Sequence, residues 1–188
     1  MAENDPLVRA GALAGAARAH ELLLTGTPRE VLARIVPEDP LDLRARIAAR
    51  IAERALLLDV EHLLLRAQAL CSLHAATWRG DPELAEWLDL RVEEALAAAL
   101  SEDPGERLGP EDLALFAAPL ELDPLALATS CARFNCLPFE QREAFLAVVL
   151  DAVAADRLAR ARQLSLSELA RRARAGLEIF RRAARSSS

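Results

Sequence analysis

A helix-capping residue directly before a proline recurs along this chain, at Thr27-Pro28, Asp39-Pro40, Asp81-Pro82 and Asp123-Pro124. Thr and Asp side chains accept hydrogen bonds from the free N–H groups at the start of a helix, and proline fits its first turn. Glu30, three residues after Thr27, completes a capping-box pattern, and Glu168 does the same after Ser165. These signals predict a chain built from a series of short helices.

Composition agrees with an all-α fold. Ala, Leu and Arg dominate, and all three are good helix formers, whereas the aromatic residues that strands favour make up only 4% of the chain. Between the caps, apolar residues recur at helical spacing, and no stretch alternates as a strand would. We therefore predict helices over residues 7–24, 28–36, 41–57, 60–78, 82–100, 111–117, 124–134, 139–152, 155–162 and 166–184.

A stretch rich in glycine, proline and acids separates two halves of the chain. Residues 101–112 read SEDPGERLGPED and contain little that is apolar, which is typical of a linker. The 188 residues suffice for two small helical domains, each with a modest core. The predicted organisation is an N-terminal extension at 1–20, a helical domain at 21–100, a short acidic linker at 101–123 and a second helical domain at 124–185.

Patterns typical of enzymes, metal sites and membrane proteins are missing from the sequence. The three cysteines form no CxxC pair, the three histidines lack metal-ligand spacing, and there is no glycine-rich phosphate loop. We therefore expect no enzyme activity, no cofactor and no small-molecule substrate. Acidic residues near the N-terminus do not suit a signal peptide, and charges interrupt every apolar run, so we expect a cytoplasmic protein without membrane insertion.

Positive charge is concentrated near the C-terminus. The chain carries a net charge of −6 and no lysine, yet residues 156–185 hold nine arginines against three acids, a local net charge of +6. The same range predicts two short helices joined by a tight turn at 163–165, a helix-turn-helix whose second helix enters the DNA major groove by its N-terminal part. An Arg-rich solvated surface is the alternative. The candidate DNA-contacting residues are Ser165, Ser167, Glu168, Arg171, Arg172 and Arg174.

Glu168 has two interpretations. It can close the capping box with Ser165, which we favour, or accept a hydrogen bond from N4 of a cytosine. Inner positions of the second helix are predicted for Leu169, Ala173, Leu177 and Phe180.

The C-terminal half resembles region 4 of extracytoplasmic-function (ECF) sigma factors over residues 137–183 without a gap. Leu137-Pro138 corresponds to the Leu-Pro that opens that region, and residues 141–146, QREAFL, correspond to its first helix. Leu158-Ala159 corresponds to the family's Ile-Ala, and residues 165–172 overlie the turn and the recognition helix.

The N-terminal half resembles region 2 of the same family. Residues 59–63, DVEHL, correspond to a DAEDL-like segment, Trp78-Arg79-Gly80 to an aromatic-Arg-Gly motif, and Trp87-Leu88 to a Trp-Leu pair. The resemblance covers roughly residues 20–100 and 124–185, in the order of the family's regions.

The resemblance implies a sigma factor that binds core RNA polymerase and recognises promoter DNA for transcription initiation. It implies polymerase binding by Asp59, Glu61, His62, Leu63 and Arg66. It implies contact with the promoter −10 region by Trp78, Arg79, Trp87 and Arg91. An anti-sigma factor is a partner implied by family habit alone.

The charge of region 2 leaves a second function open. Residues 81–103 hold eight acids and a single base, Arg91, where the family has a basic helix, and such a surface repels phosphates. The alternative is a degenerate sigma-like protein that acts as a regulatory or protein-interaction module without promoter-melting activity. Trp87 is expected to anchor helix packing, whereas for Trp78 both packing and stacking on an unpaired base stay open.

Overall fold

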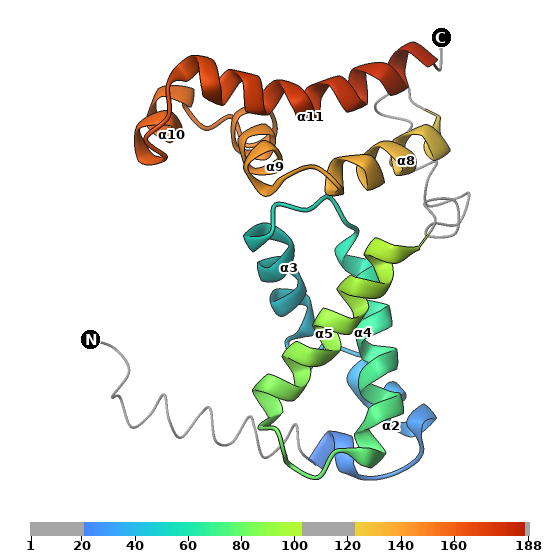
Figure 1. Ribbon diagram of the computed structural model, residues 1–188. Helices are drawn as coiled ribbons and strands as arrows, with labels where there is room; N and C mark the ends of the chain where they lie inside the picture. Colours follow the sequence, from blue (N-terminus) through green and yellow to red (C-terminus); the bar gives the residue numbers. More distant parts are fainter. Residues whose placement is uncertain (1–20, 103–122, 187–188) are drawn as a thin grey trace. The chain divides into compact units, whose positions relative to one another are not determined.

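The computed structural model describes residues 21–102 and 123–186 (Figure 1). Every regular element in these ranges is a helix, which confirms the all-α class. The described chain forms two compact units: unit 1 contains 21–49 and Asp59–Ala98, and unit 2 contains Arg50–Leu58 together with 99–102 and 123–186. The helix predicted at 111–117, the predicted N-terminal extension and most of the predicted linker lie outside the described residues.

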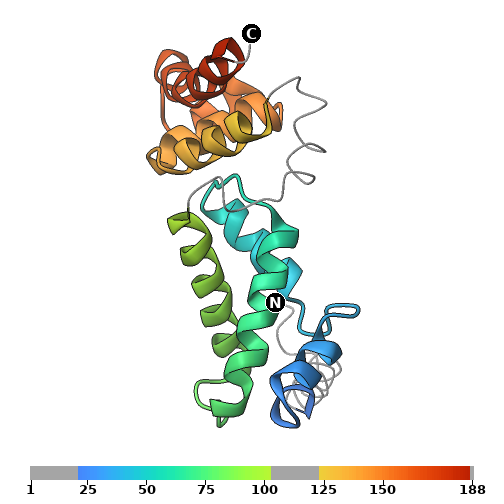
Figure 2. The same ribbon diagram turned by 90° about the vertical axis from the view of Figure 1, so that its right-hand side faces the viewer.

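Unit 1 is built on the helices α2 (Pro28–Ile35), α3 (Leu43–Glu53), α4 (Val60–His74), η1 (Ala75–Thr77, a 3-10 helix) and α5 (Leu84–Ser101), of which the last residues of α3 and α5 belong to unit 2. Helix α4 packs against α2 and lies next to α5 in both views (Figures 1 and 2).

The core of unit 1 lies between these helices, where α4 contributes Leu63, Leu64, Ala67 and Cys71. Burial raises the pKa of the Cys71 thiol to about 12, so this cysteine is an un-ionised, buried thiol.

Two of the four cap-proline signals begin helices as predicted. The N–H of Thr27 donates to the Glu30 carboxylate at 2.7 Å, and the N–H of Glu30 donates to the Thr27 hydroxyl at 3.4 Å, which confirms the capping box of α2. At the start of α8 (Pro124–Asn135), the Asp123 carboxylate accepts from the N–H of Ala126 at 2.8 Å.

The other two signals gave wrong helix starts. The Asp39 carboxylate does cap α3, but it accepts from the N–H groups of Leu43 at 3.1 Å and Arg44 at 2.7 Å, so the helix begins beyond Pro40. Helix α5 begins at Leu84 rather than at residue 82. The carbonyl of Pro82 accepts from the indole N–H of Trp78 at 2.8 Å, which keeps it in the preceding loop.

Unit 2 is built on the helices α8, α9 (Phe139–Phe145), η3 (Leu146–Leu150, a π-helix), α10 (Ala155–Ala161) and α11 (Leu166–Ser186). Helix α11 packs on α8 and α9, and α10 lies beside the beginning of α11 (Figure 1). The rings of Phe134, Phe145 and Phe180, one from each of α8, α9 and α11, have centroids 5.1 to 6.0 Å apart. A second buried cluster joins Ala144, Ala159, Leu169 and Ala173.

The helix predicted over 41–57 was wrong at its C-terminal end. Helix α3 stops at Glu53, Ala55 takes a left-handed conformation (φ 52°), and the N–H of Leu56 donates to the carbonyl of Ile51 at 3.0 Å. This pattern ends a helix and reverses the chain. The segment 54–58 that follows is then bound within unit 2: the Asn135 side chain accepts from the N–H of Leu57 at 2.8 Å and donates to its carbonyl at 2.9 Å.

Candidate nucleic-acid interface

Helices α10 and α11 are joined by the four residues Arg162 to Ser165. Gln163 adopts a left-handed conformation (φ 54°), its N–H donates to the carbonyl of Arg160 at 3.2 Å, and the N–H of Leu164 donates to that of Ala159 at 2.8 Å. These two bonds make a Schellman ending, which stops α10 and turns the chain into α11. The tight connection expected from the sequence is therefore present.

Glycine at position 163 should stabilise this turn. A left-handed conformation strains every side chain with a Cβ, and Gln gains none of the local hydrogen bonding that helps Asn there. We expect Gln163→Gly to raise the free energy of unfolding by about 0.5–1 kcal/mol, measured by urea denaturation. Gln163→Val is the opposing control, because a β-branched residue should lower stability. Equal stability of both variants would contradict a left-handed residue 163.

The start of α11 is capped by Ser165, as predicted. The Ser165 hydroxyl accepts from the N–H of Glu168 at 3.1 Å and lies 2.9 Å from the hydroxyl of Ser167. The Ser165 hydroxyl therefore serves as the helix cap, whereas Ser167 is exposed.

The favoured interpretation of Glu168 as the second half of the capping box was wrong. Its carboxylate instead accepts two bonds from Arg171, Nε to Oε2 at 2.8 Å and Nη2 to Oε1 at 2.7 Å, and one from Nε of Arg172 at 2.8 Å. Two guanidinium groups are stronger partners for a carboxylate than one backbone N–H. The hydrogen bonds from Arg171 and then Arg172 lower the pKa of Glu168 to about 2, so it is ionised at neutral pH.

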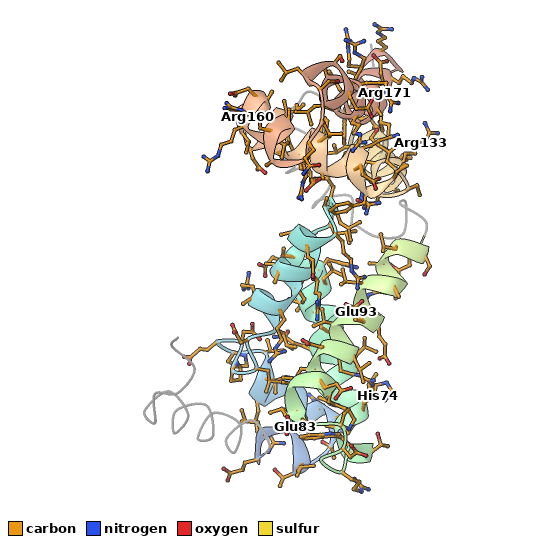
Figure 3. The ribbon with its side chains drawn as sticks, turned by 60° about the vertical axis from the view of Figure 1, so that its left-hand side comes forward. His74, Glu83, Glu93, Arg133, Arg160 and Arg171 are labelled. Carbon is orange, nitrogen blue, oxygen red and sulfur yellow. The ribbon has the colours of Figure 1, made fainter. Side chains whose placement is uncertain are left out.

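Helix α11 has a buried and an exposed face in its first half. Leu169 and Ala173 are buried in unit 2, whereas Ser167, Arg171 and Arg174 are exposed. Residues three and four apart share a face, so the exposed three form one stripe opposite the core. Arg174 makes no hydrogen bond or ion pair with another residue in the described part of the chain. Figure 3 shows Arg171 on the outside of unit 2.

The three acids of the segment 156–185 are all paired with its own arginines. Asp156 pairs with Arg160, Glu168 with Arg171 and Arg172, and Glu178 with Arg181 at 3.5 Å. Pairing inside the segment leaves its net charge of +6 unchanged. In Figure 3, the labelled arginines Arg133 and Arg160 lie at the surface of unit 2. The labelled acids Glu83 and Glu93 belong to unit 1. The local charge that DNA binding requires is therefore carried by α10 and α11.

The residues predicted to bind polymerase are only partly at the surface. Asp59 is the N-cap of α4 and accepts from the N–H of Glu61 at 2.8 Å, and the Glu61 carboxylate pairs with Arg44. Leu63 was predicted on this surface, but it is 1% exposed because α4 turns it into the core of unit 1. His62 and Arg66 are half-buried.

Two exposed leucines of α4 were missed. Leu65 is 62% exposed and Leu73 is 61% exposed, and their spacing of eight residues places them on one helix face. A run of three leucines, Leu63 to Leu65, cannot face one core from a single helix, so the sequence did hold a signal that one of them lies outside.

Two of the four residues predicted to contact the −10 region lie in the core of unit 1. Trp78 and Trp87 are 4% and 5% exposed and stack on each other with ring centroids 5.3 Å apart. This confirms the packing role of Trp87 and gives Trp78 the same role instead of a free face for a base. The Arg91 side chain is 12% exposed and pairs with Glu94 at 2.9 Å. Arg79 alone of the four is exposed.

Within the described ranges, no three His, Cys, Asp or Glu side chains are placed to hold a metal ion. No helix there combines the length and apolar character needed to cross a membrane. No protein-family model, curated protein or solved structure matches the chain.

Proposed function

We propose that this chain is a sigma-like transcription protein that binds promoter DNA through α10 and α11 and core RNA polymerase through unit 1. The observation that supports DNA binding is the exposed stripe of Ser167, Arg171 and Arg174 on α11, the second of two helices joined by a tight turn. In a helix-turn-helix, the N-terminal half of that helix reaches the base edges. The local charge of +6 supplies the attraction to phosphates.

Support for a protein partner comes from α4. Leu65 and Leu73 are two large apolar side chains exposed on one face of α4, where they offer apolar contacts to a partner protein. The resemblance of residues 59–63 to a polymerase-binding segment falls on the same helix.

A second candidate function is favoured by the burial of Trp78 and Trp87. These two of the four residues that would meet melted −10 DNA are in the core of unit 1, a third, Arg91, has a side chain only 12% exposed, and the surrounding range 81–103 is strongly acidic. Under this alternative the chain keeps DNA and protein binding but does not melt promoters, and acts as a regulatory module.

One experiment separates the two functions. Purified chain is mixed with core RNA polymerase on promoter fragments, and run-off transcription is measured beside a polymerase pull-down. Transcripts that depend on the chain support the initiating sigma factor and contradict the regulatory module. Polymerase binding without transcripts supports the module, and absence of binding to polymerase contradicts the initiating role.

DNA binding is tested through Arg174. We expect Arg174→Ala to weaken binding to duplexes of unrelated sequence by a similar factor and to reduce the slope of log K against log salt by about 1, because one phosphate contact is lost. Arg133→Ala, an exposed arginine on α8, is the matched control and should keep the wild-type slope. If both variants keep that slope, Arg174 is a solvated surface residue and does not contact DNA.

A further inference from the structure

The guanidinium group of Arg171 is held by Glu168 along one edge only. Its Nε and Nη2 atoms donate to the two carboxylate oxygens at 2.8 and 2.7 Å. A guanidinium group carries five N–H donors in a rigid plane, so this side-on contact leaves the donors between Nη1 and Nη2 without a bond to Glu168.

The edge of the Arg171 guanidinium group that does not contact Glu168 lies on an exposed side chain. Arg171 is 69% exposed and stands on the stripe of α11 that faces away from Leu169 and Ala173. Two parallel N–H donors match the O6 and N7 acceptors of guanine in the major groove, which is the commonest specific contact of arginine with a base.

Glu168 is itself fixed from a second side. Its Oε1 also accepts from Nε of Arg172, whose side chain is only 27% exposed and is therefore restrained by unit 2. A long exposed arginine loses rotamer freedom when it binds, and a carboxylate that already holds it removes part of that cost.

We propose that Glu168 is a positioning residue that holds the Arg171 guanidinium so that its free edge reads a guanine in the major groove. This inference rests on the proposed DNA binding by α10 and α11 and adds the base that is read. The lowered pKa of Glu168 agrees with it, because the carboxylate stays ionised and paired throughout the neutral range.

The test is selection of duplexes from a library with a randomised core by the full-length chain. We expect the wild type to enrich guanine at one position by roughly tenfold, the value of one good bidentate contact, and Arg171→Ala to lose that enrichment. Glu168→Gln should reduce the enrichment at the same position to about threefold or less, while affinity for unselected duplexes stays equal or rises, because a negative charge has been removed.

Glu178→Gln is the matched control. Glu178 lies on the same helix and pairs with Arg181 at 3.5 Å, so this variant removes the same charge from α11 without touching Arg171. We expect it to keep the wild-type guanine enrichment. Far-UV circular dichroism of both variants verifies that the helices are intact.

Three outcomes would overturn the inference. If Glu168→Gln keeps the full guanine enrichment, Glu168 does not position Arg171, although DNA binding stands. Enrichment of cytosine that depends on Glu168 and not on Arg171 would mean that Glu168 reads a base directly. Absence of binding to any duplex at low salt would remove the proposed function itself and with it this inference.

The pH dependence gives an independent readout. With a pKa lowered to about 2, Glu168 stays ionised and paired through the ordinary carboxyl range and loses its pairs only as the pH falls toward about 2. We therefore expect the guanine enrichment to stay constant from about pH 8 to about pH 4, where a glutamate of ordinary pKa is mostly protonated. A loss of enrichment that begins within this range would contradict the fixed ion pair.

Discussion

Replacing Arg142 with alanine should lower the free energy of unfolding of unit 2 by about 2–4 kcal/mol. The Arg142 guanidinium donates to four backbone carbonyls: those of Arg54 at 2.8 Å, Ala55 at 3.1 Å, Asn135 at 3.0 Å and Leu137 at 2.5 Å. Removal of the side chain leaves these acceptors without their charged donor, in a partly buried place where water replaces it poorly. Burial lowers the pKa of Arg142, as expected for a cation removed from solvent.

The measurement is urea denaturation followed by circular dichroism. Arg142→Lys keeps the charge but has all its hydrogen-bond donors on one nitrogen. We therefore expect it to recover no more than about half of the unfolding free energy lost in Arg142→Ala. Arg133→Ala removes an exposed arginine from α8 and should change stability by less than about 0.5 kcal/mol. If Arg142→Ala and Arg133→Ala unfold at the same urea concentration, Arg142 does not hold the segment 54–58.

The second large effect is expected at Gly176, where α11 crosses α9 with no room for a side chain. A Cβ at this position would lie 2.7 Å from the Phe145 Cγ and 2.8 Å from its Cβ. Phe145 is itself 4% exposed and in contact with Phe134 and Phe180, so it cannot move aside freely. Overpacking of this kind costs about 1–3 kcal/mol, which exceeds the gain of about 1 kcal/mol that alanine brings to a helix interior.

We therefore expect Gly176→Ala to lower the free energy of unfolding by up to about 2 kcal/mol and Gly176→Val to lower it further. Phe145→Leu makes space for the new methyl group, so the double variant Phe145→Leu/Gly176→Ala should be more stable than the sum of the single effects predicts. Ala170→Gly, at an exposed position of α11, measures the helix-propensity term alone. A Gly176→Ala variant more stable than the wild type would mean that α11 does not approach α9 this closely.

These two predictions concern contacts that the sequence did not reveal. In the sequence, Arg142 stood out only because it lies in the segment that resembles the first helix of region 4. Nothing near it indicated that its side chain would donate hydrogen bonds to carbonyls almost ninety residues earlier in the chain. The segment 54–58 reads as helix because Ala-Leu-Leu-Leu has high helix propensity. Bonds from Asn135 and Arg142 instead stabilise a turn and the irregular segment that follows it, so a tertiary contact overrode a local preference.

The candidate interface was predictable in outline but not in its contacts. The short helix, the turn, the Ser165 cap and the inner positions Leu169 and Ala173 follow from residues within a few positions of each other. The partners of Glu168 do not, because a carboxylate at the start of a helix can reach the backbone of the cap or arginines three and four residues ahead. In the structure the Glu168 carboxylate accepts hydrogen bonds from the arginines, Arg171 and Arg172.

Local chemistry and composition are sufficient to predict the all-α class, the caps at Thr27, Asp123 and Ser165, and the concentration of arginine in 156–185. The side of each helix that is buried depends instead on tertiary packing. In chains rich in Ala and Leu an apolar stripe is too broad to define a face, so Leu63 and Leu65 look equivalent in the sequence. Yet Leu63 is 1% exposed and Leu65 is 62% exposed, since packing on α2 fixes the rotation of α4.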